Sequence, residues 1–135
     1  MARRVQRSPD VNQQAEALKE RTRKFALDAI ALAKTLGATA EGDTVRRQLM
    51  RAATGVAANY RSTCRSRSRA EFVARIGIVL EEADEAELWL GIVKEAQLSS
   101  SHQVTQLWDE SQRLQSKLNP AILQFCHPAM SRSAL

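Results

Sequence analysis

Apolar residues recur at three- and four-residue intervals along most of the chain, and this spacing predicts four amphipathic helices. In the first segment one column of residues repeats every seven positions and a second column lies beside it. Together they comprise Val11, Leu18, Phe25 and Leu32, with Ala15, Thr22, Ala29 and Leu36. Such spacing places the side chains on one face of an α-helix. We expect this helix to end at Gly37, a residue suited to a left-handed C-cap.

The second helix is predicted to follow the loop TLGATAEGD, with Asp43 or Thr44 as its N-cap. Its apolar stripe consists of Val45, Leu49, Ala52 and Val56. Asn59 continues the column of Val45 and Ala52, so we expect a buried polar residue that caps the helix end or fixes packing register. Gly55, in the middle of the helix, indicates a close approach to a neighbouring helix.

The third helix begins at a capping box, in which Ser68 accepts from the amide of Glu71 and Glu71 reaches back to the cap amide. An unbroken apolar stripe then runs through Phe72, Ile76, Val79, Ala83, Ala86, Leu90 and Val93. Other apolar residues lie off this stripe, namely Leu88, Trp89 and Ile92, as Leu27, Ile30 and Ala31 do on the first helix. A helix that is apolar on more than one side is usually buried on more than one side, which predicts contacts between subunits.

A second capping box, from Ser100 to Gln103, is expected to open the fourth helix. Its inward residues are Val104, Leu107, Trp108, Ser111, Leu114 and Leu118. Asn119-Pro120 should stop or kink it, and Ile122 and Phe125 keep the helical phase, which favours a kink or a short final helix. The predicted fold is an all-α, antiparallel up-down-up-down four-helix bundle over residues 10–127. Residues 1–9 are predicted to be a flexible basic arm and 128–135 a flexible tail.

Composition agrees with a single helical domain. The chain has 135 residues, of which 4% are aromatic, and only five glycines and three prolines. Two cysteines 62 positions apart, without a secretory signal, indicate a reduced, cytoplasmic protein. No run approaches the length of a membrane span, so no membrane partner is expected.

The third helix carries a run of carboxylates that could suggest a metal site: Glu81, Glu82, Asp84, Glu85 and Glu87. Metal sites in helical bundles need inward-pointing carboxylates and Glu-x-x-His motifs, and this chain has no such motif. A solvated or ion-paired face is therefore favoured, with no metal and no cofactor. Cys64 lies beside Arg61 and Arg65, yet no histidine is near it in sequence to act as a base, so no catalytic residue is predicted.

The net charge is +5, and 15 of the 20 cationic residues are arginines. Arginine favours bidentate contacts with phosphate or carboxylate, so the bias fits nucleic acid or ion pairs. Arg46, Arg47 and Arg51 should lie level with the acidic run if the second and third helices are antiparallel. This predicts that the three arginines form ion pairs with those acids, such as Arg51 with Glu81, Glu82 or Glu85, an alternative to a nucleic-acid role for these arginines.

A second group of arginines crowds the turn between the second and third helices, consisting of Arg61, Arg65, Arg67 and Arg69, with Arg75 further along the third helix. The functional interpretation is a phosphate-binding site beside the start of a helix. Tyr60 is expected to add a stacking platform for an exposed base. The alternative is a solvated basic turn, or one paired with acids of another subunit.

The same region resembles a known family. The stretch Arg51-Ala-Ala-Thr-Gly-Val-Ala-Ala-Asn59, followed by Arg67-Ser68 and Glu71-Phe72, is similar to the signature of the bacterial four-helix-bundle family, also called the 23S ribosomal RNA intervening-sequence proteins. That signature runs R-x-x-x-S-[IV]-x-x-N, then R-x-S-x-x-E-F. The chain departs from it at Gly55, where serine is usual, and at Tyr60-Arg61-Ser62-Thr63, where many members have a hydrophobic residue and a Glu-Gly pair.

The resemblance implies an antiparallel bundle that assembles into a closed ring, expected to be a pentamer, without known catalysis. Similar accessory proteins of diversity-generating retroelements bind nucleic acid and a reverse transcriptase, but a shared fold does not fix function. Two hypotheses follow. In the first, the protein is a homo-oligomer that binds RNA or DNA through the arginine-rich bundle end. In the second, it is a protein–protein scaffold whose arginines pair with acids within or between subunits.

Overall fold

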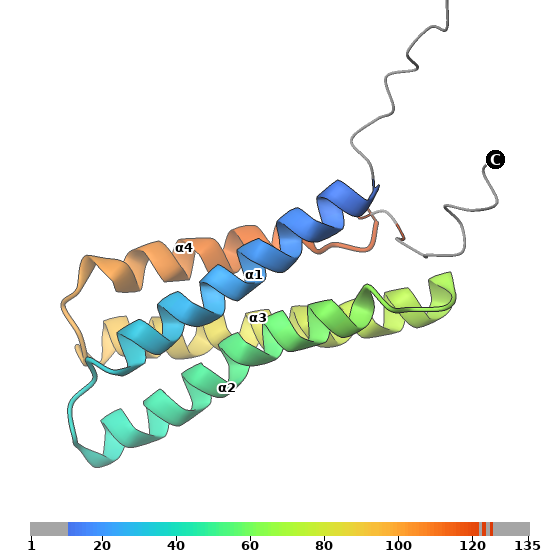
Figure 1. Cartoon of the computed structure of the whole chain (residues 1–135). Coiled ribbons are helices and arrows are strands. Elements are labelled where there is room, and N and C mark those ends of the chain that lie inside the picture. Colours follow the sequence, from blue (N-terminus) through green and yellow to red (C-terminus); the bar gives the residue numbers. More distant parts are fainter. Residues whose placement is uncertain (1–10, 122, 124, 126–135) are drawn as a thin grey trace, which may run out of the picture.

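Four helices arranged as an antiparallel bundle make up the fold (Figure 1). The computed structural model describes residues 11–121, 123 and 125. Over these residues the helices are α1 (Val11–Ala33), α2 (Ala40–Thr63), α3 (Arg69–Glu95) and α4 (His102–Lys117), and there is no strand. The expected all-α, up-down-up-down bundle is confirmed. Within the described part, no helix is both long and apolar enough to cross a bilayer.

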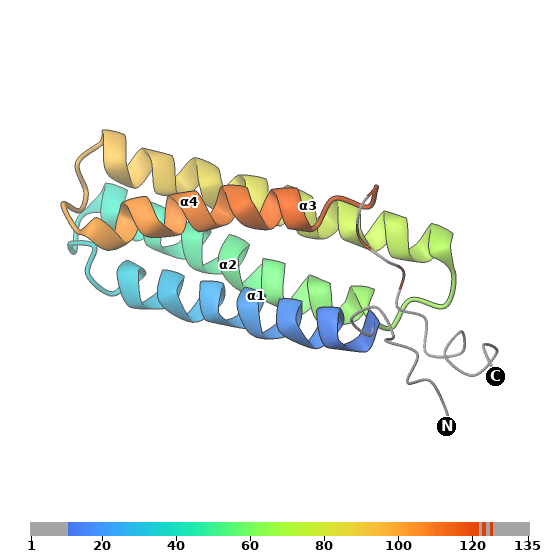
Figure 2. The ribbon, with the colours of Figure 1, turned by 90° about the horizontal axis from the view of Figure 1, so that it is seen from above.

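Packing contacts join each helix to the next along the chain, and α4 returns to α1 to close the bundle. Contacts between α2 and α3 are the most extensive, and those between α1 and α4 the least. The α1–α2 and α3–α4 connections lie at one end of the bundle, and the α2–α3 turn lies at the other (Figures 1 and 2). The first turn of α1 therefore lies at the same end as the α2–α3 turn.

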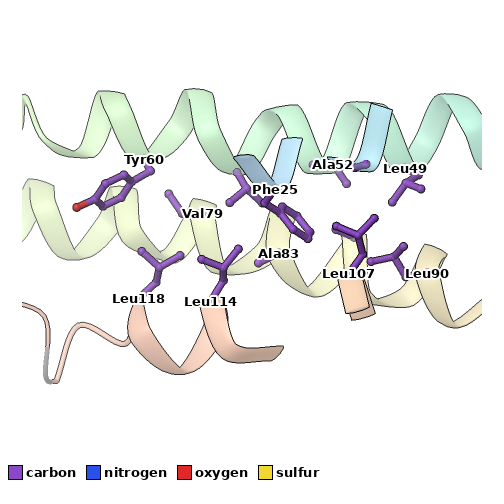
Figure 3. Packing of buried hydrophobic residues seen from close by; sticks show 14 of the residues in the cluster. Phe25, Leu49, Ala52, Tyr60, Val79, Ala83, Leu90, Leu107, Leu114 and Leu118 are labelled. Atoms are coloured by element: carbon purple, nitrogen blue, oxygen red, sulfur yellow. The ribbon is translucent and has the colours of Figure 1, made fainter. Parts of the chain in front are cut away.

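The core is a continuous column of aliphatic and aromatic side chains drawn from all four helices (Figure 3). The largest fully buried side chains include Tyr60, Phe25, Phe72, Leu32, Leu49, Ile76, Leu90, Leu114 and Leu118. The stripes expected on the second and third helices are buried as predicted. On α4, Trp108 is only half-buried and packs against the edge of this cluster.

The ends of α1 and α2 differ from the sequence prediction. Helix α1 ends at Ala33, and no glycine among the described residues has a positive φ, so Gly37 is not a left-handed C-cap. Helix α2 begins earlier than expected, because its N-cap is Thr39, whose hydroxyl oxygen accepts from the Gly42 amide at 3.0 Å. Asp43 lies in the first turn, where a carboxylate favours the helix dipole.

Arg46 binds backbone carbonyl groups at the end of α1 and in the connection that follows it. Its guanidinium donates to the carbonyl oxygens of Ala33, Leu36 and Gly37 at 3.2, 2.6 and 3.0 Å, and it also pairs with Asp43. The prediction that Arg46 pairs with acids of the third helix is therefore wrong. Its planar group instead holds the α1–α2 connection together.

The N-cap of α3 is Ser68, as predicted, and its hydroxyl accepts from the Glu71 amide at 3.1 Å. The Glu71 carboxylate accepts from the amide of Arg67 at 3.0 Å, one residue before the cap rather than at the cap itself. The N-cap of α4 is Ser101 and not Ser100, and it accepts from the Gln103 amide at 3.2 Å.

Helix α4 ends at Lys117, before the Asn119-Pro120 pair, so this pair follows the helix and does not kink it. In the described residues that follow there is a turn and no further helix. The Leu123 amide donates to the Asn119 carbonyl at 2.9 Å, and Phe125 packs on Phe72 with 5.4 Å between ring centroids. Residues 1–9 and 128–135, expected to be flexible, and Ile122 lie outside the described residues.

Some apolar side chains on the outside of α1 and α3 are not covered by the bundle. Among the large hydrophobic residues, Leu27 is 55% exposed and Leu88 is 56% exposed, and Val73 and Ile78 are also exposed. Trp89 and Ile92 are half-buried against the core. The second apolar faces expected on the first and third helices are thus present in part, at Leu27 and Leu88.

Candidate nucleic-acid interface

The turn between α2 and α3 exposes a group of guanidinium groups on a rigid backbone. The exposed arginines are Arg61, Arg65, Arg67 and Arg69. Beneath them, the buried Ser66 hydroxyl donates to the Thr63 carbonyl at 2.7 Å, and the buried Thr63 hydroxyl donates to the Asn59 carbonyl at 2.8 Å. These bonds, with the Ser68 cap, fix the turn. We name Arg61, Arg65, Arg67 and Arg69 the arginine turn.

None of the four side chains of the arginine turn forms an ion pair within 4 Å with another described residue. The only carboxylate close to them in sequence, that of Glu71, is already used. It accepts from the Arg67 amide at 3.0 Å and pairs with the Arg75 guanidinium at 2.6 Å. The positive charge of the arginine turn is therefore left uncompensated within the described part of one chain.

Arg75 has a structural role in this turn. Its guanidinium donates to the Ser62 carbonyl at 2.8 Å, near the C-terminal end of α2, as well as pairing with Glu71. A cation at a helix C-terminus is favourable because the last carbonyls are without helical partners. Arg75 lies at the basic end of the bundle, but its charge is balanced by Glu71, unlike the charges of the arginine turn.

Tyr60 does not belong to the exposed surface. Its side chain is 2% exposed and lies among core residues of α2, α3 and α4, near Val79 and Leu118 (Figure 3). The prediction that Tyr60 offers a stacking platform for a base is wrong, because the ring contributes to the core. The reason is a shift of helical phase. The buried column of α2 passes through Val56, Tyr60 and Thr63.

The same shift changes the role of Asn59. This residue is half-buried and not fully buried, and its amide nitrogen donates to the Gly55 carbonyl one turn earlier at 2.9 Å. It therefore bonds within its own helix and does not cap the end of α2. A hydrogen bond of this kind satisfies the amide without a partner from another helix.

The ion pairs predicted between Arg51 and the acids of α3 do not form in the described structure. No nitrogen of Arg51 lies within 4 Å of a carboxylate oxygen of Glu81, Glu82 or Glu85. Arg51 lies on the exposed side of α2, whereas Glu82 is folded into the seam between α2 and α3. Glu85 instead accepts a long hydrogen bond from the indole nitrogen of Trp89, at 3.4 Å.

Glu82 is the one polar side chain among the described residues with a buried atom that lacks a partner. Its Oε2 atom is buried and accepts no hydrogen bond. Burial raises the pKa of Glu82, and the neighbouring Glu85 and Glu81 raise that pKa further, while Arg51 opposes them. Arg51 therefore acts on Glu82 through the electrostatic field and not through a direct contact.

An exposed stripe of arginines along α2 extends the arginine turn, and the sequence prediction does not include it. The outer face of α2 carries the exposed residues Arg47, Arg51, Thr54, Ala58 and Arg61, and the exposed Arg65 follows them in the turn after α2. We name these six residues the α2 stripe. The signal is present in the sequence, because the spacing of three and four residues places them on one face. It is obscured by the acidic run of α3, which suggests ion pairs for Arg47 and Arg51 instead.

Other parts of the described surface offer little for catalysis. An open groove of about 620 Å³ lies between α1 and α4, lined by charged residues of both signs but by no histidine or cysteine. The ion pair of Arg21 with Glu110, at 2.6 Å, joins the two helices beside it. Among the described residues, no group of three or more histidine, cysteine or acidic side chains is arranged to hold a metal ion. Cys64 is half-buried against the core.

Comparisons with known proteins support the bundle and its family. Residues 15–120 match the model of the family described as 23S rRNA-intervening sequence protein. A solved structure from Bacteroides thetaiotaomicron, described as a protein with unknown function from the S23 ribosomal protein family, superposes with a TM-score of 0.71 at 26% identity. The match covers 79% of this chain and 99% of that one. No curated protein matches the chain.

Proposed function

The chain belongs to the 23S rRNA-intervening sequence protein family, and we propose that it is a non-enzymatic protein that binds RNA or DNA through the arginine turn. The observation that carries this proposal is the set of four exposed guanidinium groups without an acidic partner in the described chain. Exposed, uncompensated arginines on a fixed backbone suit phosphate oxygens, which accept bidentate hydrogen bonds.

Two further observations support the proposal. Helix α1 starts at Val11 at the same end of the bundle (Figure 2), and the ten residues that precede Val11 in the sequence include Arg3, Arg4 and Arg7. The basic segment before Val11 is therefore joined to the bundle at the end that carries the arginine turn. In addition, the Ser68 cap and the Glu71 carboxylate hold the start of α3, so the backbone that carries Arg67 and Arg69 is fixed.

Binding of a labelled nucleic acid, titrated with salt, tests the proposal. Phosphate contacts predict that affinity falls steeply as salt rises, and that each contact removed lowers the slope by about one. The double variant Arg61→Gln/Arg65→Gln should weaken binding and reduce the slope. Arg23→Gln/Arg113→Gln removes the same charge from exposed positions on α1 and α4 and should change little. Absence of binding by the unaltered protein at low salt contradicts the proposal.

We also propose that the protein is a homo-oligomer, with a pentameric ring as the expected assembly. The exposed apolar residues of α1 and α3 support this, because Leu27, Ile78 and Leu88 need a cover that the single chain does not supply. Light scattering coupled to size-exclusion chromatography measures the subunit number directly. Leu88→Glu should lower it, whereas Thr54→Glu on the outer face of α2 should not.

A protein–protein scaffold is the second candidate function. It is favoured by the acidic residues exposed on α3, Glu81 and Asp84, which are open to arginines of a second subunit. If it holds, charge reversal at Arg61 changes the subunit number, and nucleic-acid binding is absent or unaffected. If charge reversal at Arg61 leaves the subunit number unchanged and abolishes nucleic-acid binding, the first function is supported.

A further inference from the structure

We infer that the nucleic acid this protein takes is a duplex, and that its phosphates lie along the α2 stripe, an inference that rests on the proposed function. The arginine turn alone would be a compact patch at one end of the bundle. The α2 stripe instead continues from that end along the outer face of α2, from Arg65 back to Arg47. A linear array of guanidinium groups fits an extended, regular polyanion.

The dimensions of the α2 stripe match the scale of a duplex. Arg47 and Arg61, the first and last arginines of the stripe within α2, are separated by 14 positions, which at about 1.5 Å per residue is roughly 21 Å along the helix. Duplex DNA advances about 3.4 Å per base pair, so this part of the stripe spans roughly six base pairs. Arg51 and Arg61 are roughly 15 Å apart along the axis by the same rise, comparable to the roughly 12 Å width of a major groove.

The middle of the α2 stripe leaves room for such a contact. Between the two pairs of arginines the exposed positions are Thr54 and Ala58, both small. The Thr54 hydroxyl is turned back to its own helix, where it donates to the Met50 carbonyl at 2.7 Å. A duplex can therefore approach the helix between Arg51 and Arg61 without meeting a long side chain or an acid of the α2 stripe.

Aromatic residues argue against recognition of single strands. Proteins that bind single strands usually stack bases on exposed aromatic rings. All six aromatic residues of this chain lie at described positions, and every one is buried or packs against the core: Phe25, Tyr60, Phe72, Trp89, Trp108 and Phe125. The surface thus offers cations for a phosphate backbone but no platform for unpaired bases, which favours recognition of duplex backbone and shape.

A binding comparison at equal charge tests this inference. The probes are a duplex of about 12 base pairs, as RNA and as DNA, and an unstructured single strand of about 24 nucleotides with a similar number of phosphates. We expect the full-length protein to bind a duplex at least about tenfold more tightly than the single strand. The RNA and DNA arms show which duplex geometry is preferred.

Variants identify the surface. Arg47→Gln/Arg51→Gln should weaken duplex binding and lower the salt slope by about two, because both cations lie on the α2 stripe. Arg23→Gln/Arg113→Gln, with the same charge change elsewhere, should leave both unchanged. Equal or tighter binding of the single strand, or no effect of Arg47→Gln/Arg51→Gln, overturns the inference while the proposed function stands. No binding of any probe at low salt overturns both.

Discussion

The Glu82 carboxylate of α3 lies against Gly55 of α2, in space that a larger residue would occupy. A Cβ atom at position 55 would lie 2.9 Å from Glu82 Oε2 and 3.0 Å from its Cδ. The absence of a side chain at position 55 therefore makes room for the Glu82 carboxylate of α3. From the sequence alone, this glycine is expected to allow a close approach of two helices. The consequence is a carboxylate oxygen that is buried without a hydrogen-bond donor, a costly arrangement for a charged group.

Gly55→Ala should stabilise the protein. Alanine is favoured over glycine in a helix by up to about 1 kcal/mol, and the flexible end of Glu82 can swing out to water. We expect the free energy of unfolding, measured by urea denaturation, to rise by about 1 kcal/mol. Gly77→Ala on α3 is the control, since nothing lies within 4 Å of a Cβ there. If Gly55→Ala markedly lowers the free energy of unfolding and Gly77→Ala does not, the Glu82 side chain cannot move away from position 55.

Glu82→Gln should change how stability depends on pH. A carboxyl group with a raised pKa binds more protons in the folded than in the unfolded chain, so stability falls as pH rises through the window that begins near its ordinary value of 4.5. A glutamine side chain cannot ionise, so the variant should gain stability relative to the parent as pH rises through this window. Denaturation curves at several pH values measure this gain. If the difference in free energy of unfolding between variant and parent is the same at about pH 4 and about pH 7, the effect does not come from ionisation of Glu82.

Arg46→Ala should destabilise the bundle, because it removes bonds to three carbonyls and one carboxylate at the α1–α2 connection. Hydrogen bonds of charged groups contribute about 1.5–3 kcal/mol. We expect a loss in that range in thermal or urea unfolding, with only partial recovery in Arg46→Lys, which lacks the planar fork. Its neighbour Arg47 is exposed, and Arg47→Ala should stay within about 0.5 kcal/mol of the parent.

Tyr60→Leu should affect stability and not nucleic-acid affinity. The ring is buried in the core, so its replacement leaves a cavity, at a cost of roughly 1–3 kcal/mol for an apolar side chain of smaller volume. The folded variant should bind nucleic acid as tightly as the parent, within about twofold. If the variant melts at the same temperature as the parent but binds nucleic acid more weakly, Tyr60 has a role in binding.

The order, direction and core of the four helices were predictable, because an apolar period sustained over many turns constrains the fold strongly. The ends of the helices were less predictable. Thr39, Asp43 and Thr44 are all good N-cap residues, and the structure uses Thr39, whose hydroxyl accepts from the Gly42 amide. Such choices depend on tertiary contacts that local sequence does not contain.

The candidate site was predictable in part. The arginine turn follows from charge clustering and is exposed. The predictions for Tyr60 and Asn59 fail because a column of every seventh residue drifts by about 20° per heptad relative to a straight helix, so the core reaches position 60 by the end of α2. The burial of Glu82 beside Gly55 has no sequence signal, since an acidic run normally stays in water.

The weak seam between α1 and α4 has a kinetic consequence. These two helices are the most distant in sequence of the four packed pairs, share the least contact and are separated by an open groove. Pairs adjacent in sequence close quickly, so α2 and α3 should form early, with α1 joining α4 last. The contact between α1 and α4, which forms last, is then the first to open. In native-state hydrogen exchange, amides of α1 and α4 should exchange through partial opening at lower denaturant than those of α2 and α3, which would open only when the whole bundle unfolds.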